Sequence, residues 1–291
     1  MKKSKAFSLF EISIVTVVIA VLMAGVLQSR NIVKKAKLNN ARALTVSSPV
    51  KSIDDIVAWF EPTLEKSFTK DEGVDGNKIS TWYDINPNIT TTANNANQST
   101  SINRPTYTES AINGIPAIRF NSSSSNYLLF DGTSLANSPY TVFIVEQRRA
   151  SNSDNFIIAG SNTPDNTNLT IGYSTDTKLM MAYRNNGYYA NISGYSNIIP
   201  RIHSVVFNFS ARKYYVNGAE LTLIPYGAYP SQSSPTQAFD DAALGRITIL
   251  GTSSYYEGDI GEVIIFKKAL TSEERKSVEQ YLSKKWNIDL N

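Results

Sequence analysis

The feature that most constrains this chain is an apolar run close to its start. Residues 7–27, FSLFEISIVTVVIAVLMAGVL, carry a single charge, at Glu11. A helix of about 20 residues is about 30 Å long, which matches the hydrocarbon core of a bilayer. A carboxylate at the centre of such a helix costs about 3 kcal/mol, so we expect Glu11 near the interface or beside a positive partner. The run predicts a transmembrane helix.

The residues after the apolar run favour continuation of the same helix. The stretch QSRNIVKKAKLNNARALTV, 28–46, contains neither Gly nor Pro, and the next Pro is Pro49. Lys, Arg, Ala and Leu are good helix formers. We therefore predict one long helical segment over 7–48, of which 7–27 spans the membrane. A thin apolar face in its outer half is expected to pack on a domain or on sister helices: Ile32, Val33, Ala36, Leu38 and Ala43.

Charge and rare residues exclude several classes of function. The chain has a formal charge of +3, but residues 1–6 carry +3 and residues 7–42 carry +4, which leaves −4 for residues 43–291. A weakly acidic domain does not suit a nucleic-acid ligand, because phosphate neutralisation needs a basic surface. The chain has no Cys and one His. Thiolate and histidine metal clusters are excluded, and we expect His203 to be an ordinary strand residue.

After Pro49 the sequence takes on an all-β character. Asn, Ser, Thr, Tyr and Gly become frequent, and short apolar runs alternate with turn residues. Asn217-Gly218 marks the clearest hairpin turn. Many short strands with few helices predict two packed sheets. The candidate strands are 56–60, 117–120, 127–130, 140–146, 156–159, 169–173, 178–183, 202–209, 213–216, 246–250 and 261–266.

The last segment, ALTSEERKSVEQYLSKKWNIDL, predicts a helix. Thr271 at the cap position and Glu274 three residues later form a capping-box pattern. One face of this helix is apolar and should pack on the sheets; it comprises Val278, Tyr281, Leu282 and Trp286.

The start of the chain resembles type IV pilins and pseudopilins. Residues 2–22, KKSKAFSLFEISIVTVVIAVL, place a small residue, a Phe and a Glu after a short basic leader, as that family does. The resemblance implies that residues 1–6 form a leader, which a prepilin peptidase removes between Ala6 and Phe7 before the new terminus is methylated. Ala6 stands where the family usually has Gly. Glu11 corresponds to the family's glutamate, whose charge can pair with the α-amine of Phe7 in a neighbouring subunit.

Two other interpretations of the N-terminus stay open. It can be an ordinary signal peptide whose apolar region ends near Met23, Ala24 and Gly25, although no clean cleavage site follows. It can also be a plain signal anchor, and charge does not decide its orientation because both flanks are basic.

The remainder, 52–291, resembles bacterial LamG-like, concanavalin A-like domains. The resemblance rests on phrases such as IVAWFEP (56–62), INGIPAIRFN (112–121) and, most specifically, GDIGEVIIFKKALTSEERKSVEQYLSKKW (258–286). It implies a two-sheet jelly-roll sandwich that binds glycans or protein surfaces, in some members with calcium at the rim. Oxygen ligands for calcium would come from Asp84, Asn86, Asp131, Asp240 and Asp241. Tyrosines expected in loops, where rings can stack on sugars, are Tyr183, Tyr188, Tyr189, Tyr195, Tyr226, Tyr229, Tyr255 and Tyr256.

A possible catalytic pattern lies at the start of the last candidate strand. Glu257, Asp259 and Glu262 have the spacing E-x-D-x-x-E that some glucanases of this fold use. In a bulged strand they could point to one side, as retaining glycoside hydrolysis requires. Gly258 replaces the apolar residue of those enzymes, so the simpler interpretation is a structural lead-in to a core strand.

The resulting hypothesis is a non-enzymatic pilin, minor pilin or pseudopilin of a type IV pilus or type II secretion system. It would be anchored in the cytoplasmic membrane by one span and would display the sandwich outside, without an obligatory cofactor. Its expected partners are the prepilin peptidase, other pilin subunits and a glycan or surface protein. The alternatives are an anchored glycoside hydrolase and a tethered lectin that does not assemble.

Overall fold

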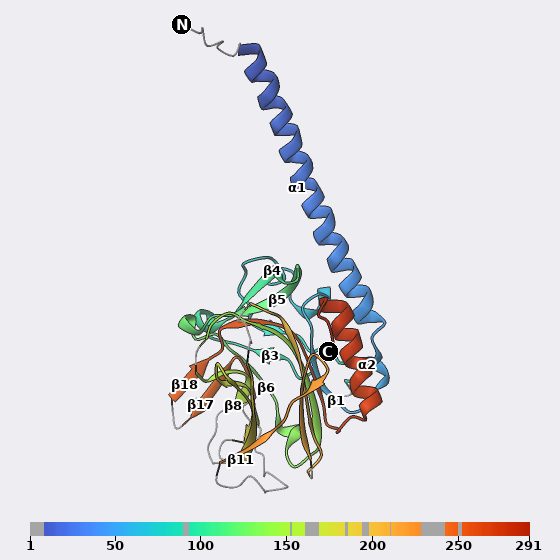
Figure 1. Ribbon diagram of the computed structural model, residues 1–291, viewed down its shortest axis with the longest axis vertical. Helices are drawn as coiled ribbons and strands as arrows, with labels where there is room; N and C mark the ends of the chain where they lie inside the picture. Colours follow the sequence, from blue (N-terminus) through green and yellow to red (C-terminus); the bar gives the residue numbers. More distant parts are fainter. Residues whose placement is uncertain are drawn as a thin grey trace.

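A long helix and a β-sandwich make up the computed structural model (Figure 1). It describes residues 9–89, 93–151, 153–160, 169–183, 186–193, 198–209, 211–227, 242–249 and 252–291. Helix α1, Leu9–Val46, has 38 residues and projects far beyond the sandwich (Figure 1). Its apolar part is long enough to cross a membrane, and none of that part is buried. The predicted long helix is confirmed.

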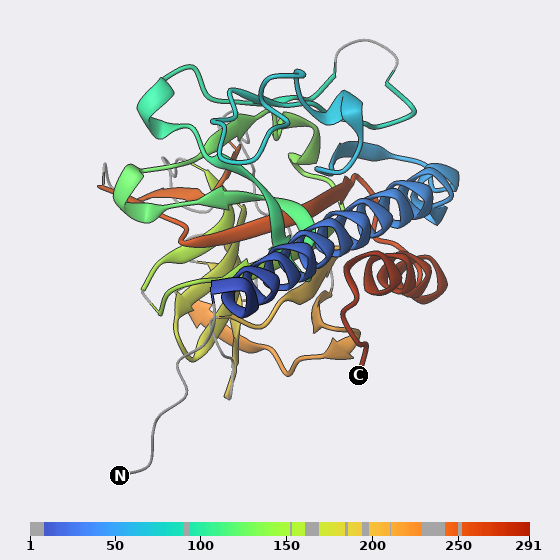
Figure 2. The same cartoon turned by 90° about the horizontal axis from the view of Figure 1, so that it is seen from above.

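The thin apolar face predicted in the outer half of α1 lies mostly outside the contact with the sandwich, so its packing on sister helices stays a prediction. Ile32, Val33 and Ala43 are exposed, whereas Ala41 and Thr45 are completely buried. The reason is that only the last turns of α1 reach the sandwich, where they lie beside the C-terminal helix (Figure 2). The apolar side chains further out have no protein to pack on.

Within the described residues, the first sheet has eight antiparallel strands. Its order is β14-β13-β12-β7-β19-β5-β4, and β1 also pairs with β19. The strands are β1 (Ile56–Phe60), β4 (Thr106–Ile112), β5 (Ile115–Phe120), β7 (Tyr140–Arg148), β12 (Arg201–Phe207), β13 (Arg212–Val216), β14 (Ala219–Glu220) and β19 (Gly258–Phe266).

The second sheet has nine strands in the part of the chain that is described, in the order β15-β11-β10-β9-β8-β16-β6-β3-β2, and a two-stranded ribbon pairs β17 with β18. Its strands are β2 (Thr81–Trp82), β3 (Ala96–Asn97), β6 (Leu128–Phe130), β8 (Asn155–Gly160), β9 (Leu169–Thr175), β10 (Lys178–Tyr183), β11 (Asn186–Asn191), β15 (Ile224–Gly227) and β16 (Ala242–Leu244). The ribbon is β17 (Arg246–Ile249) and β18 (Thr252–Tyr255). The described residues also contain five short 3-10 helices: η1 (Pro49–Ser52), η2 (Glu65–Ser67), η3 (Ser101–Asn103), η4 (Ser122–Ser124) and η5 (Thr133–Leu135).

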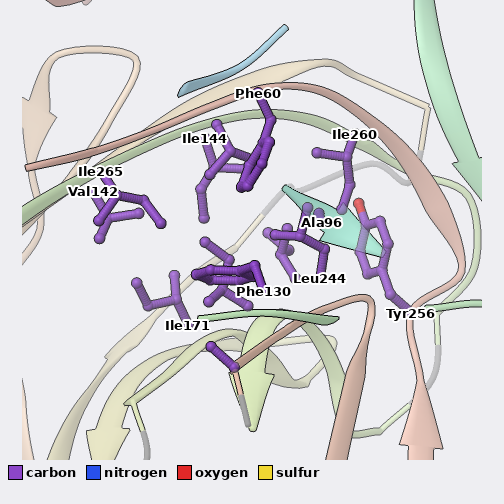
Figure 3. Close-up of a cluster of buried hydrophobic side chains, with 14 of the residues drawn as sticks. Phe60, Ala96, Phe130, Val142, Ile144, Ile171, Leu244, Tyr256, Ile260 and Ile265 are labelled. Carbon is purple, nitrogen blue, oxygen red and sulfur yellow. The ribbon is translucent and has the colours of Figure 1, made fainter. Parts of the chain in front are cut away.

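Two apolar cores lie on the two faces of the first sheet. Val263 and Ile265 of β19 face the second sheet, whereas Ile264 and Phe266 face α2 (Ser272–Trp286). Figure 3 shows the core between the sheets, with Phe60 and Ile144 opposite Phe130 and Leu244. Because side chains alternate along a strand and both faces are covered, residues 263–266 of β19, VIIF, are apolar without interruption.

The predicted turn and cap are both confirmed. Asn217 and Gly218 have φ of 49° and 80°, as a tight hairpin between β13 and β14 requires. Thr271 caps α2 in a full capping box with Glu274. The apolar face predicted for this helix is buried.

Candidate functional site

A broad, open groove of about 930 Å³ lies beside the edge of the second sheet. Its walls are the residues that follow β2, the strand β3, the segment from Tyr127 to Ser134 and the start of β1. We call it the amide groove, because six of its lining side chains carry a carboxamide: Asn86, Asn88, Asn94, Asn95, Asn97 and Gln98.

The buried polar groups at the base of the amide groove hold its loops in place. Asp84 Oδ1 accepts the N–H groups of Trp59 at 2.8 Å and Asn86 at 2.9 Å, and Oδ2 accepts the N–H of Asn94 at 3.2 Å. The side chain of Asn94 pairs with the backbone of Asp131 through two hydrogen bonds of 2.7 and 2.8 Å. Burial raises the pKa of Asp84, although these backbone N–H bonds oppose the rise.

Asp84 and Asp131, which we considered as calcium ligands, each accept hydrogen bonds from nearby loop residues and do not form a common metal site with each other. Asp131 Oδ1 accepts the N–H and the hydroxyl of Thr133 at 2.8 and 2.6 Å. No group of three or more acidic, His or Cys side chains suited to a metal occurs among the described residues. Asp240 and Asp241 lie outside the described residues.

The rim of the amide groove offers uncharged polar groups to solvent. Asn88, Asn97, Ser99 and Thr100 are exposed and line the groove. Half-buried Leu129 adds an apolar surface between them.

An aromatic ring completes this surface. The half-buried Tyr127 lines the groove, and the guanidinium carbon of Arg246 lies 4.1 Å from its ring centroid. Carboxamides, hydroxyls and an apolar patch in one open surface are suited to hydrogen-bonding a neutral polar ligand.

The three carboxylates of the E-x-D-x-x-E pattern each have a different set of partners. Glu257 accepts the N–H and hydroxyl of Ser122 at 2.7 and 2.8 Å. Asp259 is completely buried and forms a two-bond contact with Arg119, at 2.7 and 3.1 Å. The expected bulge is present, since the pairing of β19 with β7 shifts between Ile260 and Glu262.

Glu262 lies beneath helix α2 instead of in a cleft. Its oxygens accept hydrogen bonds from the Trp59 and Trp286 indole N–H groups at 2.8 and 2.9 Å and from the Tyr281 hydroxyl at 2.7 Å. Lys285 lies 2.8 Å away, and the glutamate is 1% exposed. These contacts join β19 to α2.

The single histidine is a buried strand residue, as predicted. His203 of β12 has one ring nitrogen 2.9 Å from Glu146 and the other 3.0 Å from the Tyr214 hydroxyl. Glu146 also accepts hydrogen bonds from Tyr173 and Tyr256, at 2.7 and 2.5 Å. Burial would raise the pKa of Glu146, but the hydrogen bond and charge of His203 lower it.

The tyrosines expected in loops mostly belong to strands. Tyr188 and Tyr189 lie in β11, Tyr226 in β15 and Tyr255 in β18, and Tyr256 is completely buried. These strands were not predicted because Asn, Gly, Ser or Pro, which are less common in strands, surround the tyrosines in the sequence. Tyr195, Tyr229 and the side chain of Tyr183 lie outside the described residues.

The processing site can be described only in part. Ala6 and Phe7 lie outside the described residues, and Glu11 lies in the exposed first turn of α1. The amide groove was not predicted from the sequence as a site. The density of Asn, Ser and Thr between 86 and 100 was the available signal, but we interpreted it as turn chemistry.

Comparisons with known proteins agree with this fold. A family model described as the concanavalin A-like lectin/glucanases superfamily matches residues 121–274. This match confirms the concanavalin A-like sandwich that the sequence predicted. No curated protein matches the chain.

The solved structures that resemble this chain include a sialidase and a domain of an arabinanase. Trypanosoma rangeli sialidase in complex with sialic acid has a TM-score of 0.54 and 12% identity, over 82% of this chain and 34% of that chain. Domain 4 of AbnA, an extracellular arabinanase from Geobacillus stearothermophilus, in complex with arabinotriose, has a TM-score of 0.49 and 17% identity, over 77% of this chain and 97% of that chain. The chain thus spans about a third of the sialidase, and the likeness to it shows the fold alone.

Proposed function

We propose that this chain, which belongs to the concanavalin A-like lectin/glucanases superfamily, is a membrane-anchored protein that binds neutral glycans in its amide groove. The observation that carries the proposal is that a buried charged group of the groove has a structural role, whereas exposed amide side chains of the groove are neutral. Its buried Asp84 binds backbone N–H groups, whereas uncharged Asn88 and Asn97 face solvent.

The groove's chemistry favours neutral sugars over acidic ones. Carboxamides donate and accept hydrogen bonds together, which suits the adjacent hydroxyls of a sugar ring. The exposed charges that line the groove are Asp55, Asp131 and Lys267, so the surface is not positive. A carboxylated or sulfated glycan would find no excess of cations there.

Binding can be tested with the full chain in mild detergent. The probes are a panel of neutral oligosaccharides and their sialylated counterparts, with affinity measured by calorimetry. We expect a neutral oligosaccharide to bind, and we expect the double variant Asn88→Ala/Asn97→Ala to bind it about tenfold more weakly or worse. Asn191→Ala, a change of an exposed amide in β11 outside the groove, is the matched control. Equal binding by both variants, or a preference for sialylated sugars, would contradict the proposal that the amide groove binds neutral glycans.

We also propose that the chain has no glycosidase activity. Support comes from Glu262, which is buried under α2, and from Asp259, which is bonded to Arg119. The discriminating experiment is hydrolysis of labelled β-glucan and aryl glycosides by the wild type and Glu257→Gln. Turnover that disappears in this variant would favour the hydrolase alternative.

For the N-terminal segment we propose pilin-like processing and assembly. The leader pattern and the exposed apolar surface of α1 support this role. Prepilin peptidase would cut between Ala6 and Phe7, and the helices of several subunits would bundle in a pilus or secretion filament, with the sandwich outside the cytoplasmic membrane.

The first measurement is the terminal residue of the mature protein, by mass spectrometry with and without the peptidase. A methylated Phe7 that depends on the peptidase is the expected result. An intact Met1 would leave a tethered lectin, and a terminus beyond Ala24 would leave a secreted one.

A further inference from the structure

A second groove lies between α1 and the β4-β5 hairpin, at the end of the sandwich from which α1 projects (Figure 1). We call it the helix groove; its volume is about 730 Å³. A hydrogen bond joins α1 to the hairpin at the inner end of this groove, because the Lys37 ammonium donates to the carbonyl of Asn113 at 3.0 Å. The hairpin contributes Ser110 and Gly114 to the lining.

The lining of the helix groove changes from apolar to cationic along α1. Val21, Leu22 and Val26 line its outer part, and Arg30 and Lys34 line the part nearer the sandwich. Residues four apart on a helix lie on one face, so Leu22, Val26 and Arg30 form a continuous wall. Arg30 and Lys34 are exposed, and no side-chain hydrogen bond or ion pair joins either of them to another described residue.

The depth of these side chains corresponds to the two parts of a phospholipid. If the apolar run ends at the hydrocarbon edge near residue 27, Arg30 lies about 5 Å and Lys34 about 10 Å further out. The headgroup layer of one leaflet is about 5 to 8 Å thick, and long cationic side chains reach along a helix to such a layer. The cations therefore lie at phosphate depth, while Val21, Leu22 and Val26 lie at the depth of acyl chains.

We propose that the helix groove binds an anionic phospholipid, with its headgroup phosphate on Arg30 and Lys34 and an acyl chain along the apolar wall. The inference rests on the proposed membrane insertion of α1. A second copy of α1 packed here in register would instead bring its own Arg30 and Lys34 against these cations. Like-charge repulsion makes that occupant less favourable than a lipid phosphate.

The experiment uses the full chain in bilayer nanodiscs that contain equal amounts of phosphatidylcholine and phosphatidylglycerol. Mild detergent extraction followed by native mass spectrometry identifies the lipids that stay bound. We expect one phosphatidylglycerol to be retained at least tenfold over phosphatidylcholine. Removing a cation near the surface lowers such binding roughly fivefold, so Arg30→Gln/Lys34→Gln should abolish the preference.

A matched control removes two exposed cations from the sandwich, as Lys70→Gln/Lys276→Gln, and should keep the preference. Retention of both lipids equally, loss of the preference in the control, or a lipid-free dimer would each overturn the proposal. Failure of the wild type to enter nanodiscs would reject membrane insertion itself. Insertion without lipid selectivity would reject only the lipid site.

Discussion

The ammonium of Lys285 lies 2.7 Å from the carboxylate of Glu61, across 224 positions of the chain, and neither side chain is exposed. Lys285 also lies 2.8 Å from the buried Glu262. The network reaches α1, because the hydroxyl of Thr45 lies 3.4 Å from Glu61. Three charges thus join α2, the end of β1 and β19 beneath helix α1.

Replacing this lysine should destabilise the sandwich strongly. Lys285→Met leaves two buried glutamates without their cation, and breaking a buried pair costs about 3 to 5 kcal/mol. Urea unfolding followed by tryptophan fluorescence measures the loss, because all three tryptophans are buried in this domain. The exposed neighbour provides the control, Lys284→Met, which should change the free energy of unfolding by less than about 0.5 kcal/mol. Similar losses in the two variants would mean that the network contributes little.

The same network makes a prediction for acid stability. Burial alone would raise the pKa of Glu61, but the charge and hydrogen bond of Lys285 hold it below its usual value of 4.5. The unfolded chain therefore binds more protons at acid pH than the folded chain does. The contribution of Glu61 to the free energy of unfolding is present above its pKa in the unfolded chain and disappears as the pH falls through its pKa in the folded chain.

The measurement is the urea midpoint between pH 6 and pH 3. We expect the wild type to lose stability over this interval and Lys285→Met to lose less, because the variant lacks the group that lowers the pKa of Glu61. Parallel curves for the two proteins would show that other carboxylates, such as Glu146, dominate the acid response.

The capping box of α2 should contribute measurably to stability. Thr271→Ala removes the hydroxyl that accepts the N–H of Glu274 at 3.2 Å. Loss of such a cap costs about 1 kcal/mol. The measurement is urea unfolding of Thr271→Ala and of the control Ser272→Ala, which changes an exposed residue in the first turn of α2. The difference between the two free energies of unfolding gives the contribution of the cap. Equal losses of stability in the two variants would mean that the buried apolar face of α2, and not its cap, stabilises the helix.

Two glycines with the same backbone conformation should respond differently to alanine. Gly245 and Gly76 have φ of 82° and 85°, which is strained for any side chain. A Cβ at Gly245 would meet the Phe120 ring, whereas a Cβ at Gly76 would meet nothing within 4 Å.

Gly245→Ala should therefore cost about 1 to 3 kcal/mol more than Gly76→Ala, because only the first adds overpacking. Thermal denaturation of both variants tests the difference. Equal melting temperatures would indicate that Phe120 moves aside without cost.

Local patterns predicted many elements of the fold correctly. The short, continuous apolar runs of β1 and β10 predicted those strands to the residue, and Asn217-Gly218 predicted the hairpin. The short strands β2 and β16 were missed, because their two or three residues are too few for a period to appear. The polar strand β4, TYTESAI, was missed because its pairing with β5 shifts in register and breaks the alternation.

The sequence by itself determined the long apolar helix α1, the capped final helix and the sandwich class, because each depends on periods and caps that act over a few residues. Only the tertiary structure decided what the carboxylates do. The bulge in β19 turns Glu262 towards α2, and the docking of α2 brings Lys285 between Glu262 and Glu61. Those contacts join segments that are distant along the chain, so their geometry depends on register and packing that no local pattern encodes.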